Sequence, residues 1–191
     1  MPIPIILIHG IKDDARKMEP MARYLQAGGR TVYTVTLRPS FGQVGLEVLA
    51  EQLRDFVETN IDPAEKIDLV GFSMGGLVCR YYLQRLDGLS KVGSLITLGT
   101  PHHGTWTAYI LQNIGSKQMR PKSEFLNDLN HDADTLKQVQ CVSIWTPFDL
   151  IILPSTSSRI SFGKNIRTWR LVHPGLVWSK KSMKIVETLL K

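Results

Sequence analysis

Ser73 lies in the pentapeptide "GFSMG" (71–75), between an apolar stretch and a stretch with helical spacing. A serine at a sharp turn from strand to helix can act as a nucleophile, because the turn raises its hydroxyl above the sheet. The N-terminus of the following helix has partial positive charge and free N–H groups that suit a developing anion. Small residues two positions before and after the serine relieve crowding. The pattern favours nucleophilic acyl transfer over its alternative, an inert serine in a tight glycine turn.

A serine nucleophile needs a base, and the chain has five histidines: His9, His102, His103, His131 and His173. For a serine at such a turn, the order along the chain is serine, acid, histidine. His9 precedes Ser73, so we expect it to support its loop rather than to act in catalysis. No acid at a strand end separates Ser73 from the histidines at 102–103, and the one at 131 lies in an irregular segment. His173 follows the last expected strand and is the predicted base.

The acid is expected after a strand, between Ser73 and His173. Six carboxylates lie in this interval: Asp87, Glu124, Asp128, Asp132, Asp134 and Asp149. Only Asp149 follows an expected strand, in the apolar segment "CVSIWTPFDLII". A carboxylate in apolar surroundings is costly unless it is paired. Pairing with the N–H of His173 would hold the imidazole tautomer and stabilise the imidazolium. The alternative is an aspartate that caps a loop.

Two backbone N–H groups are predicted to hold the oxyanion that forms when Ser73 attacks a carbonyl. One belongs to Met74, the residue after the nucleophile. The other comes from the loop after an earlier strand, here the segment "LIHGI" (7–11). Its glycine lets the backbone turn, so that the N–H of Ile11 faces the site. The side chain of Ile11 would only line the pocket.

Apolar runs rich in β-branched residues alternate with helical patterns along the chain. We expect strands at 4–9, 31–37, 67–72, 93–99, 139–145 and 166–172, and helices at 44–60, 74–86 and 179–191, the last capped by Ser179. This alternation predicts an α/β fold, a compact three-layer sandwich whose mostly parallel sheet of about six strands has helices on both faces. The length of 191 residues favours one domain over 1–191. The three candidate side chains follow strands, at the edge where sites form in such sheets.

The segment from 101 to 138 interrupts this alternation, since no strand pattern occurs in it. A long insertion of this kind is a lid or substrate-binding segment, or contains helices. A helix there would place five apolar residues mainly on one side: Trp106, Tyr109, Ile110, Leu111 and Ile114. These residues either line an acyl pocket or pack onto the sheet. Trp106, Tyr109 and Ile110, with Ile151 beside the acid, are the predicted substrate-binding residues.

Composition limits the class of protein. The chain is 43% hydrophobic and 21% charged, which is typical of a soluble globular protein, and it has no apolar run long enough to span a membrane. The first residues predict a buried strand rather than a signal peptide. Cys79 and Cys141 suggest no disulfide framework and fit a reducing compartment. The net charge of +6 suits anionic surfaces, but without a polybasic cluster or nucleic-acid motif a solvated basic face is favoured.

The segments "PIILIHGI", "IDLVGFSMGGLVCRYYLQRLDG", "KVGSLITLGTPHHGT", "SIWTPFDLII" and "LVHPGLVWS" resemble the small bacterial lipases of the α/β-hydrolase fold, the lipase class 2 group. The resemblance covers nearly the whole chain. It implies that Ser73, Asp149 and His173 are nucleophile, acid and base, and that Ile11 and Met74 are the oxyanion donors. It also implies ester hydrolysis without a metal or an organic cofactor. The insertion is longer than in the smallest members and is similar to that of lid-bearing bacterial lipases.

We therefore expect a lipase or carboxylesterase that cleaves lipid esters through a Ser-His-Asp triad and an acyl-enzyme. Two alternatives stay open. One is an acyltransferase that uses the same triad, and the other is a non-catalytic binding protein on a hydrolase fold. The presence of all three residues favours the enzyme. We expect a monomer in the cytoplasm that takes a lipid or acyl-ester substrate, contacts a membrane surface transiently and binds no nucleic acid.

Overall fold

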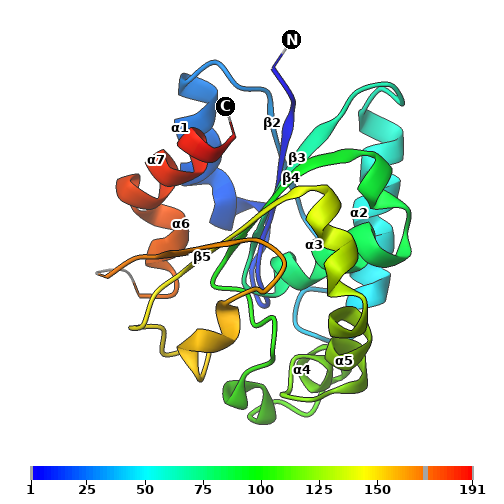
Figure 1. Cartoon of the computed structure of the whole chain (residues 1–191), viewed down its shortest axis with the longest axis vertical. Coiled ribbons are helices and arrows are strands. Elements are labelled where there is room, and N and C mark those ends of the chain that lie inside the picture. The colour runs from blue at the N-terminus through cyan, green and yellow to red at the C-terminus, as the bar shows by residue number, and fades with distance from the viewer. Residues whose placement is uncertain (1, 170–171, 191) are drawn as a thin grey trace.

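A sheet of six parallel strands forms the centre of the molecule (Figure 1). The computed structural model describes residues 2–169 and 172–190. The strand order is β2-β1-β3-β4-β5-β6, and each neighbouring pair is parallel. The strands are β1 (Ile5–Ile8), β2 (Val32–Val35), β3 (Ile67–Phe72), β4 (Val92–Leu98), β5 (Gln140–Trp145) and β6 (Lys164–Arg167). The predicted α/β class, strand number and parallel direction are confirmed.

Helices cover both faces of this sheet (Figure 1). One face packs against α1 (Glu19–Ala27), α6 (Gly175–Trp178) and α7 (Lys180–Leu189), and the other against α2 (Leu46–Asn60) and α3 (Met74–Arg85). Successive side chains of a strand point to opposite faces. Ile6 and Ile8 of β1 accordingly join the core under α2 and α3, whereas Ile5 and Leu7 join the core under α1 and α7. A strand buried on both faces must be apolar throughout, which explains the uninterrupted run in β1.

Some elements differ from expectation. The strand β6 starts two residues earlier than predicted and ends at Arg167; positions 170–171 of the predicted strand lie outside the described residues. The helices α1 and α6 were not predicted. The predicted cap of α7 is present, because the Ser179 hydroxyl accepts a hydrogen bond from the Lys181 N–H at 3.2 Å.

The segment 101–138 connects β4 to β5 and, as predicted, contains no strand. It consists of the 3₁₀ helix η3 (Trp106–Tyr109), the helices α4 (Ile114–Gln118) and α5 (Glu124–His131), and the 3₁₀ helix η4 (Ala133–Gln138). Three further 3₁₀ helices lie elsewhere in the described ranges: η1 (Ala15–Met18), η2 (Gly88–Ser90) and η5 (Ser155–Ser158). The insertion lies at the carboxyl end of the strands, at the bottom of Figure 1.

Arg80 of α3 holds this insertion against the rest of the protein by hydrogen bonds. Its side chain is fully buried and donates hydrogen bonds to the Leu129 carbonyl at 2.6 Å and to the Asn130 side-chain oxygen at 3.0 Å. Both acceptors belong to α5, so the charged group holds that helix against α3. Burial lowers the pKa of Arg80 to about 10, and the guanidinium therefore stays charged at neutral pH.

Candidate active site

Ser73 occupies the turn between β3 and α3. Its φ of 53° and ψ of −122° lie in a region that residues other than glycine rarely adopt, so the backbone here is strained. The Ser73 N–H donates to the Leu98 carbonyl of β4 at 2.8 Å, and the Ser73 carbonyl accepts from the Gly76 N–H at 3.1 Å. These bonds to a neighbouring strand and to the helix hold the strained conformation in place.

The glycines around Ser73 allow strand and helix to approach closely. A Cβ atom added at Gly71 would lie 2.6 Å from the backbone of Gly76, and one at Gly75 would lie 2.5 Å from the His9 carbonyl oxygen. Both distances are shorter than real Cβ contacts. Gly71 and Gly75 are therefore required by packing, as the "GFSMG" pattern predicts.

Asp149 and His173 are in direct contact. The His173 Nδ1 lies 2.7 Å from the Asp149 Oδ2. The other carboxylate oxygen, Oδ1, accepts from the backbone N–H groups of Ile151 at 2.9 Å and Ile152 at 2.8 Å. Asp149 is only 2% exposed, and these three hydrogen bonds offset the cost of burying its charge. Because Nδ1 donates to the carboxylate, the Nε2 of the neutral ring is left as a proton acceptor.

The insertion supports the loop that contains the acid. The Thr105 hydroxyl donates to the Ile151 carbonyl at 2.9 Å, and the Trp106 N–H donates to the Leu153 carbonyl at 2.9 Å. The insertion therefore helps to position Asp149 and its backbone donors, besides its predicted contact with substrate.

Ile11 lies in the loop after β1, and Met74 directly follows Ser73 as the first residue of α3. Within the described residues, neither N–H group donates a hydrogen bond to the protein. The Lys12 residue after Ile11 has a left-handed φ of 62°, and its N–H donates to the Ser40 carbonyl at 2.9 Å. This bond fixes the loop after β1. Without a protein acceptor among the described residues, each N–H is available for the oxyanion-binding role that the sequence predicts.

Two of the remaining histidines are structural. The His9 Nε2 accepts from the Leu37 N–H at 3.0 Å, and its Nδ1 donates to the Gly10 carbonyl at 2.8 Å, as expected of a loop support. His102 is fully buried with its Nε2 at 3.0 Å from the Thr97 hydroxyl. Burial, with the charge of Arg80 second, lowers the pKa of His102 well below its usual value.

Ser73 and His173 line the same cavity of about 390 Å³. Its apolar lining comes from six residues: Ile11, Phe72, Ile110, Leu111, Ile151 and Pro174. Two predicted substrate-binding residues, Ile110 and Ile151, are therefore at the site. The other two, Trp106 and Tyr109, do not line this cavity as the structure describes it. Trp106 instead lines a separate cavity with His103.

Trp106 and Tyr109 miss the cavity because the segment is not one continuous α-helix. The apolar face was predicted for a single helix through 106–114, but η3 ends at Tyr109 and α4 starts at Ile114. In a 3₁₀ helix residues three apart lie above one another, so the rings of Trp106 and Tyr109 stack with centroids 5.6 Å apart. Ile110 and Leu111 follow this turn and line the cavity.

The sequence argument missed three charged residues of the cavity: Lys12, Asp13 and Lys17. They lie in the loop after β1 and in η1, and their only signal in the sequence was proximity to Ile11. Across residues 2–169 and 172–190, no three His, Cys, Asp or Glu side chains are grouped so that they could hold a metal ion.

The chain is similar in sequence to known lipases and thioesterases. The sequence profile of the palmitoyl protein thioesterase family matches residues 4–117, a stretch that contains Ser73 but ends before Asp149 and His173. A triacylglycerol lipase of Pseudarthrobacter phenanthrenivorans is 32% identical over 120 residues, which are 58% of this chain and 37% of the lipase. The lysosomal thioesterase PPT2 of Mus musculus is 30% identical over 107 residues, 54% of this chain and 35% of the thioesterase. The match thus spans about a third of the length of these relatives.

The fold has a solved counterpart. The crystal structure of Bacillus licheniformis lipase BlEst2 in its mature form aligns with a TM-score of 0.83, over 100% of this chain and 92% of that one, at 18% sequence identity. The predicted α/β-hydrolase fold is therefore confirmed.

Proposed function

The chain belongs to the palmitoyl protein thioesterase family, and on that premise we propose that it is a serine hydrolase that cleaves carboxylic esters of lipids. One observation supports this most strongly: Asp149 holds the Nδ1 of His173 at 2.7 Å in the wall of the cavity that Ser73 also lines. Such an arrangement of nucleophile, oriented base and acid is what acyl transfer to water requires.

The proposed reaction has two halves. His173 takes the Ser73 proton at Nε2 while Ser73 attacks the ester carbonyl, and the N–H groups of Ile11 and Met74 hold the oxyanion. The alcohol leaves with the proton from His173. Water then loses a proton to His173 and attacks the acyl-enzyme, which releases the acid and restores Ser73. Asp149 stabilises the imidazolium in both halves.

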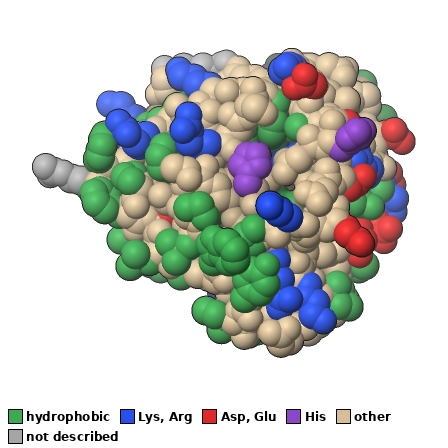
Figure 2. Space-filling model, turned by 60° about the horizontal axis from the view of Figure 1, so that its bottom comes forward, with side chains coloured by type: hydrophobic (Ala, Val, Ile, Leu, Met, Phe, Trp, Pro, Cys, Tyr) green, Lys and Arg blue, Asp and Glu red, His purple; other side chains and the backbone are tan. Residues whose placement is uncertain are grey.

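The acyl chain is proposed to lie in the apolar part of the Ser73 cavity, against Ile110 and Ile151. Eight large apolar side chains of the insertion and of the Asp149 loop are exposed: Trp106, Tyr109, Ile110, Ile114, Phe148, Leu150, Ile151 and Leu153. Figure 2 brings the end of the molecule with the insertion forward and shows hydrophobic side chains gathered there, with Lys and Arg side chains next to them. We propose that this surface contacts a membrane transiently, because apolar groups bordered by cations suit an anionic bilayer surface.

Thioester hydrolysis is a second candidate, favoured by the family to which the chain belongs. The same residues would cleave a thioester, since the acyl-enzyme and its hydrolysis are identical and only the leaving group differs. Hydrolysis of an acyl thioester and of the oxygen ester with the same acyl chain, compared under one condition, separates the two. An acyltransferase, the third possibility, would form a new ester when an acceptor alcohol is added.

The cellular location and the oligomeric state of the protein stay predictions. No helix in the described ranges is long and apolar enough to cross a membrane. Cys79 and Cys141 are both buried and free, as suits the reducing cytoplasm that we propose. We also propose that the protein acts as a monomer, and light scattering of the purified chain tests this.

The decisive experiment replaces the nucleophile. Ser73→Ala is expected to reduce hydrolysis of p-nitrophenyl esters by at least about 10⁴-fold and to abolish labelling by a fluorophosphonate probe. The matched control is Ser90→Ala, because Ser90 is an exposed serine outside the cavity. Turnover in Ser73→Ala at the level of the control, with both variants folded by circular dichroism, would refute the proposal.

A further inference from the structure

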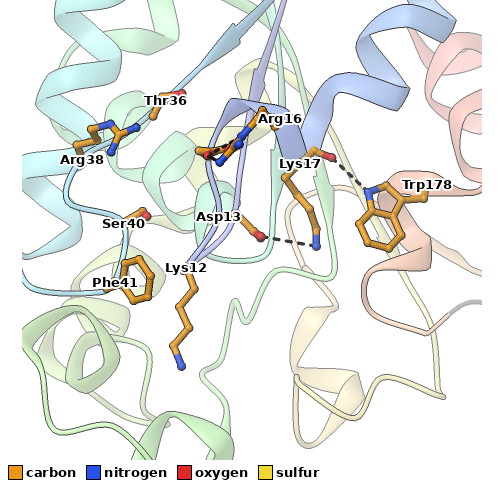
Figure 3. A pocket seen from close by; sticks show the side chains of 10 residues that line it. Lys12, Asp13, Arg16, Lys17, Thr36, Arg38, Ser40, Phe41 and Trp178 are labelled. Carbon is orange, nitrogen blue, oxygen red and sulfur yellow. Dashed lines mark hydrogen bonds and ion pairs between the residues drawn. The ribbon is translucent and has the colours of Figure 1, made fainter.

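A second cavity, of about 510 Å³, adjoins the Ser73 cavity. Three residues line both cavities: Lys12, Asp13 and Lys17. Figure 3 shows this second cavity, with Arg38 and Trp178 on opposite sides of the view. We name it the Lys12–Arg38 cavity. The two cavities therefore adjoin each other along these three side chains.

The Lys12–Arg38 cavity has an excess of positive charge. Four cations line it (Lys12, Arg16, Lys17 and Arg38) together with two carboxylates, Asp13 and Asp14. Asp14 is paired with Arg16 at 2.6 Å, and Asp13 lies 3.6 Å from the Lys17 ammonium. Figure 3 shows the Asp13–Lys17 pair as a dashed line between the two side chains. Among the described residues, Lys12 and Arg38 have no carboxylate within 4.0 Å. The cavity thus keeps a net charge of about +2.

The two cavities differ in the polarity of their walls, so they suit different parts of an ester substrate. The Ser73 cavity is lined by Ile110, Leu111 and Ile151, which are apolar and match an acyl chain. The Lys12–Arg38 cavity offers cations and the hydroxyls of Thr36 and Ser40. An ester whose carbonyl lies at Ser73 with its acyl chain among the isoleucines has only its alcohol half left to enter the charged cavity.

The backbone that presents Lys12 and Arg38 is held in place. The Lys12 N–H donates to the Ser40 carbonyl at 2.9 Å, which joins the two loops that supply the cations. Gln52 of α2 binds the Arg38 backbone twice, by accepting from its N–H at 2.9 Å and by donating to its carbonyl at 2.5 Å. Preorganised backbone lowers the entropic cost of binding a small charged group.

We propose that the Lys12–Arg38 cavity binds a phosphate group on the alcohol half of the substrate, so that the preferred substrates are acyl esters of phosphorylated alcohols. This inference rests on the proposed ester hydrolysis. Water is consumed, the acyl carbon–oxygen bond breaks, and the products are a fatty acid and the free phosphorylated alcohol; the phosphate ester bond is untouched. Arg38 and Lys12 extend in different directions in Figure 3, so each can separately supply a charge-assisted hydrogen bond to a phosphate that enters the cavity.

The test compares two soluble esters, 1-hexanoylglycerol 3-phosphate and 1-hexanoylglycerol, which differ only in the phosphate. Because both are used as monomers in solution, attraction to an anionic lipid surface does not contribute. We expect wild-type kcat/KM to favour the phosphorylated ester by about 10-fold at low ionic strength, as two solvent-accessible cations can provide. The preference is expected to fall by about threefold or more in Arg38→Gln and to approach one in Lys12→Gln/Arg38→Gln.

The control variant is Lys164→Gln. It removes the same charge at the first residue of β6, at the opposite edge of the sheet, and is expected to keep the wild-type preference. A wild-type ratio near one, or a ratio that Arg38→Gln and Lys164→Gln leave equally unchanged, would overturn the proposal.

A binding experiment separates this inference from the proposed catalysis. Trp178 lines the cavity, and its indole N–H donates to the Lys17 carbonyl at 3.3 Å. In the Ser73→Ala protein, we expect the indole NMR signal of Trp178 to shift on addition of glycerol 3-phosphate but not of glycerol, and the shift to disappear in the Lys12→Gln/Arg38→Gln background. This shift would support the phosphate site even if no ester were hydrolysed, whereas its absence at millimolar ligand would refute it.

Discussion

Replacing Asp149 by asparagine tests the proposed catalytic arrangement without removing its packing. The Asp149 Oδ1 accepts two backbone N–H groups, at 2.9 and 2.8 Å, and its Oδ2 accepts the His173 Nδ1–H at 2.7 Å. In Asp149→Asn the amide oxygen can keep the two backbone bonds, which leaves the NH₂ group facing Nδ1. The imidazole then has to present a lone pair at Nδ1 and carry its proton on Nε2.

That tautomer cannot take a proton from Ser73. We therefore expect kcat/KM for p-nitrophenyl butyrate to fall by about 10³–10⁴-fold at pH 7.5, the effect of the wrong tautomer in a serine triad. The free energy of unfolding should change by less than about 1 kcal/mol, because the acceptor of the two backbone bonds is retained. Asp149→Ala, which removes that acceptor, should lose about 1–3 kcal/mol in addition to activity.

Initial rates and urea unfolding of the same preparations check both parts. The control is Asp87→Asn, an exposed aspartate whose side chain makes no hydrogen bond in the described structure and which should behave as wild type. Asp149→Asn with more than a tenth of wild-type activity would refute the assignment of Asp149 as the acid. A loss of activity that accompanied unfolding would refute the hydrogen-bond argument.

Three further outcomes are expected. Gly71→Ala should lower the free energy of unfolding by about 1–3 kcal/mol in urea, since its Cβ would lie 2.6 Å from the Gly76 backbone, and should reduce activity by displacing the nucleophile turn. Arg80→Ala should cost about 3 kcal/mol by the same measurement, because buried acceptors in α5 lose their donor. The free energy of unfolding should fall as the pH decreases from 7 to 5. Burial lowers the pKa of His9 and His102 in the folded chain, whereas the unfolded chain takes up these protons near pH 6.5. Each histidine therefore contributes a loss of up to about 1.4 kcal/mol per pH unit. Urea unfolding at three pH values checks this, and His102→Gln should reduce the slope.

The sequence predicted most of what depends on periodicity and order along the chain. The strand β3 was predicted at its observed bounds, 67–72, because a strand buried on both faces is apolar throughout. The helix α1 was missed: its buried residues are Met21, Ala22 and Leu25, too few to form a clear stripe. The order of serine, acid and histidine along the chain predicted Ser73, Asp149 and His173 as partners. In the structure Asp149 contacts His173, and His173 lines the same cavity as Ser73.

Other features were decided by the tertiary structure, because they depend on loops without periodicity. Nothing in the helical spacing of the insertion indicated that η3 would end at Tyr109 and place Ile110, rather than Trp106, at the cavity. Lys12 and Arg38 are 26 positions apart, and hydrogen bonds from Lys12 to Ser40 and from Leu37 to His9 join their loops. Local sequence thus determined which groups can react, and the packing of loops over the sheet determined which charges surround them.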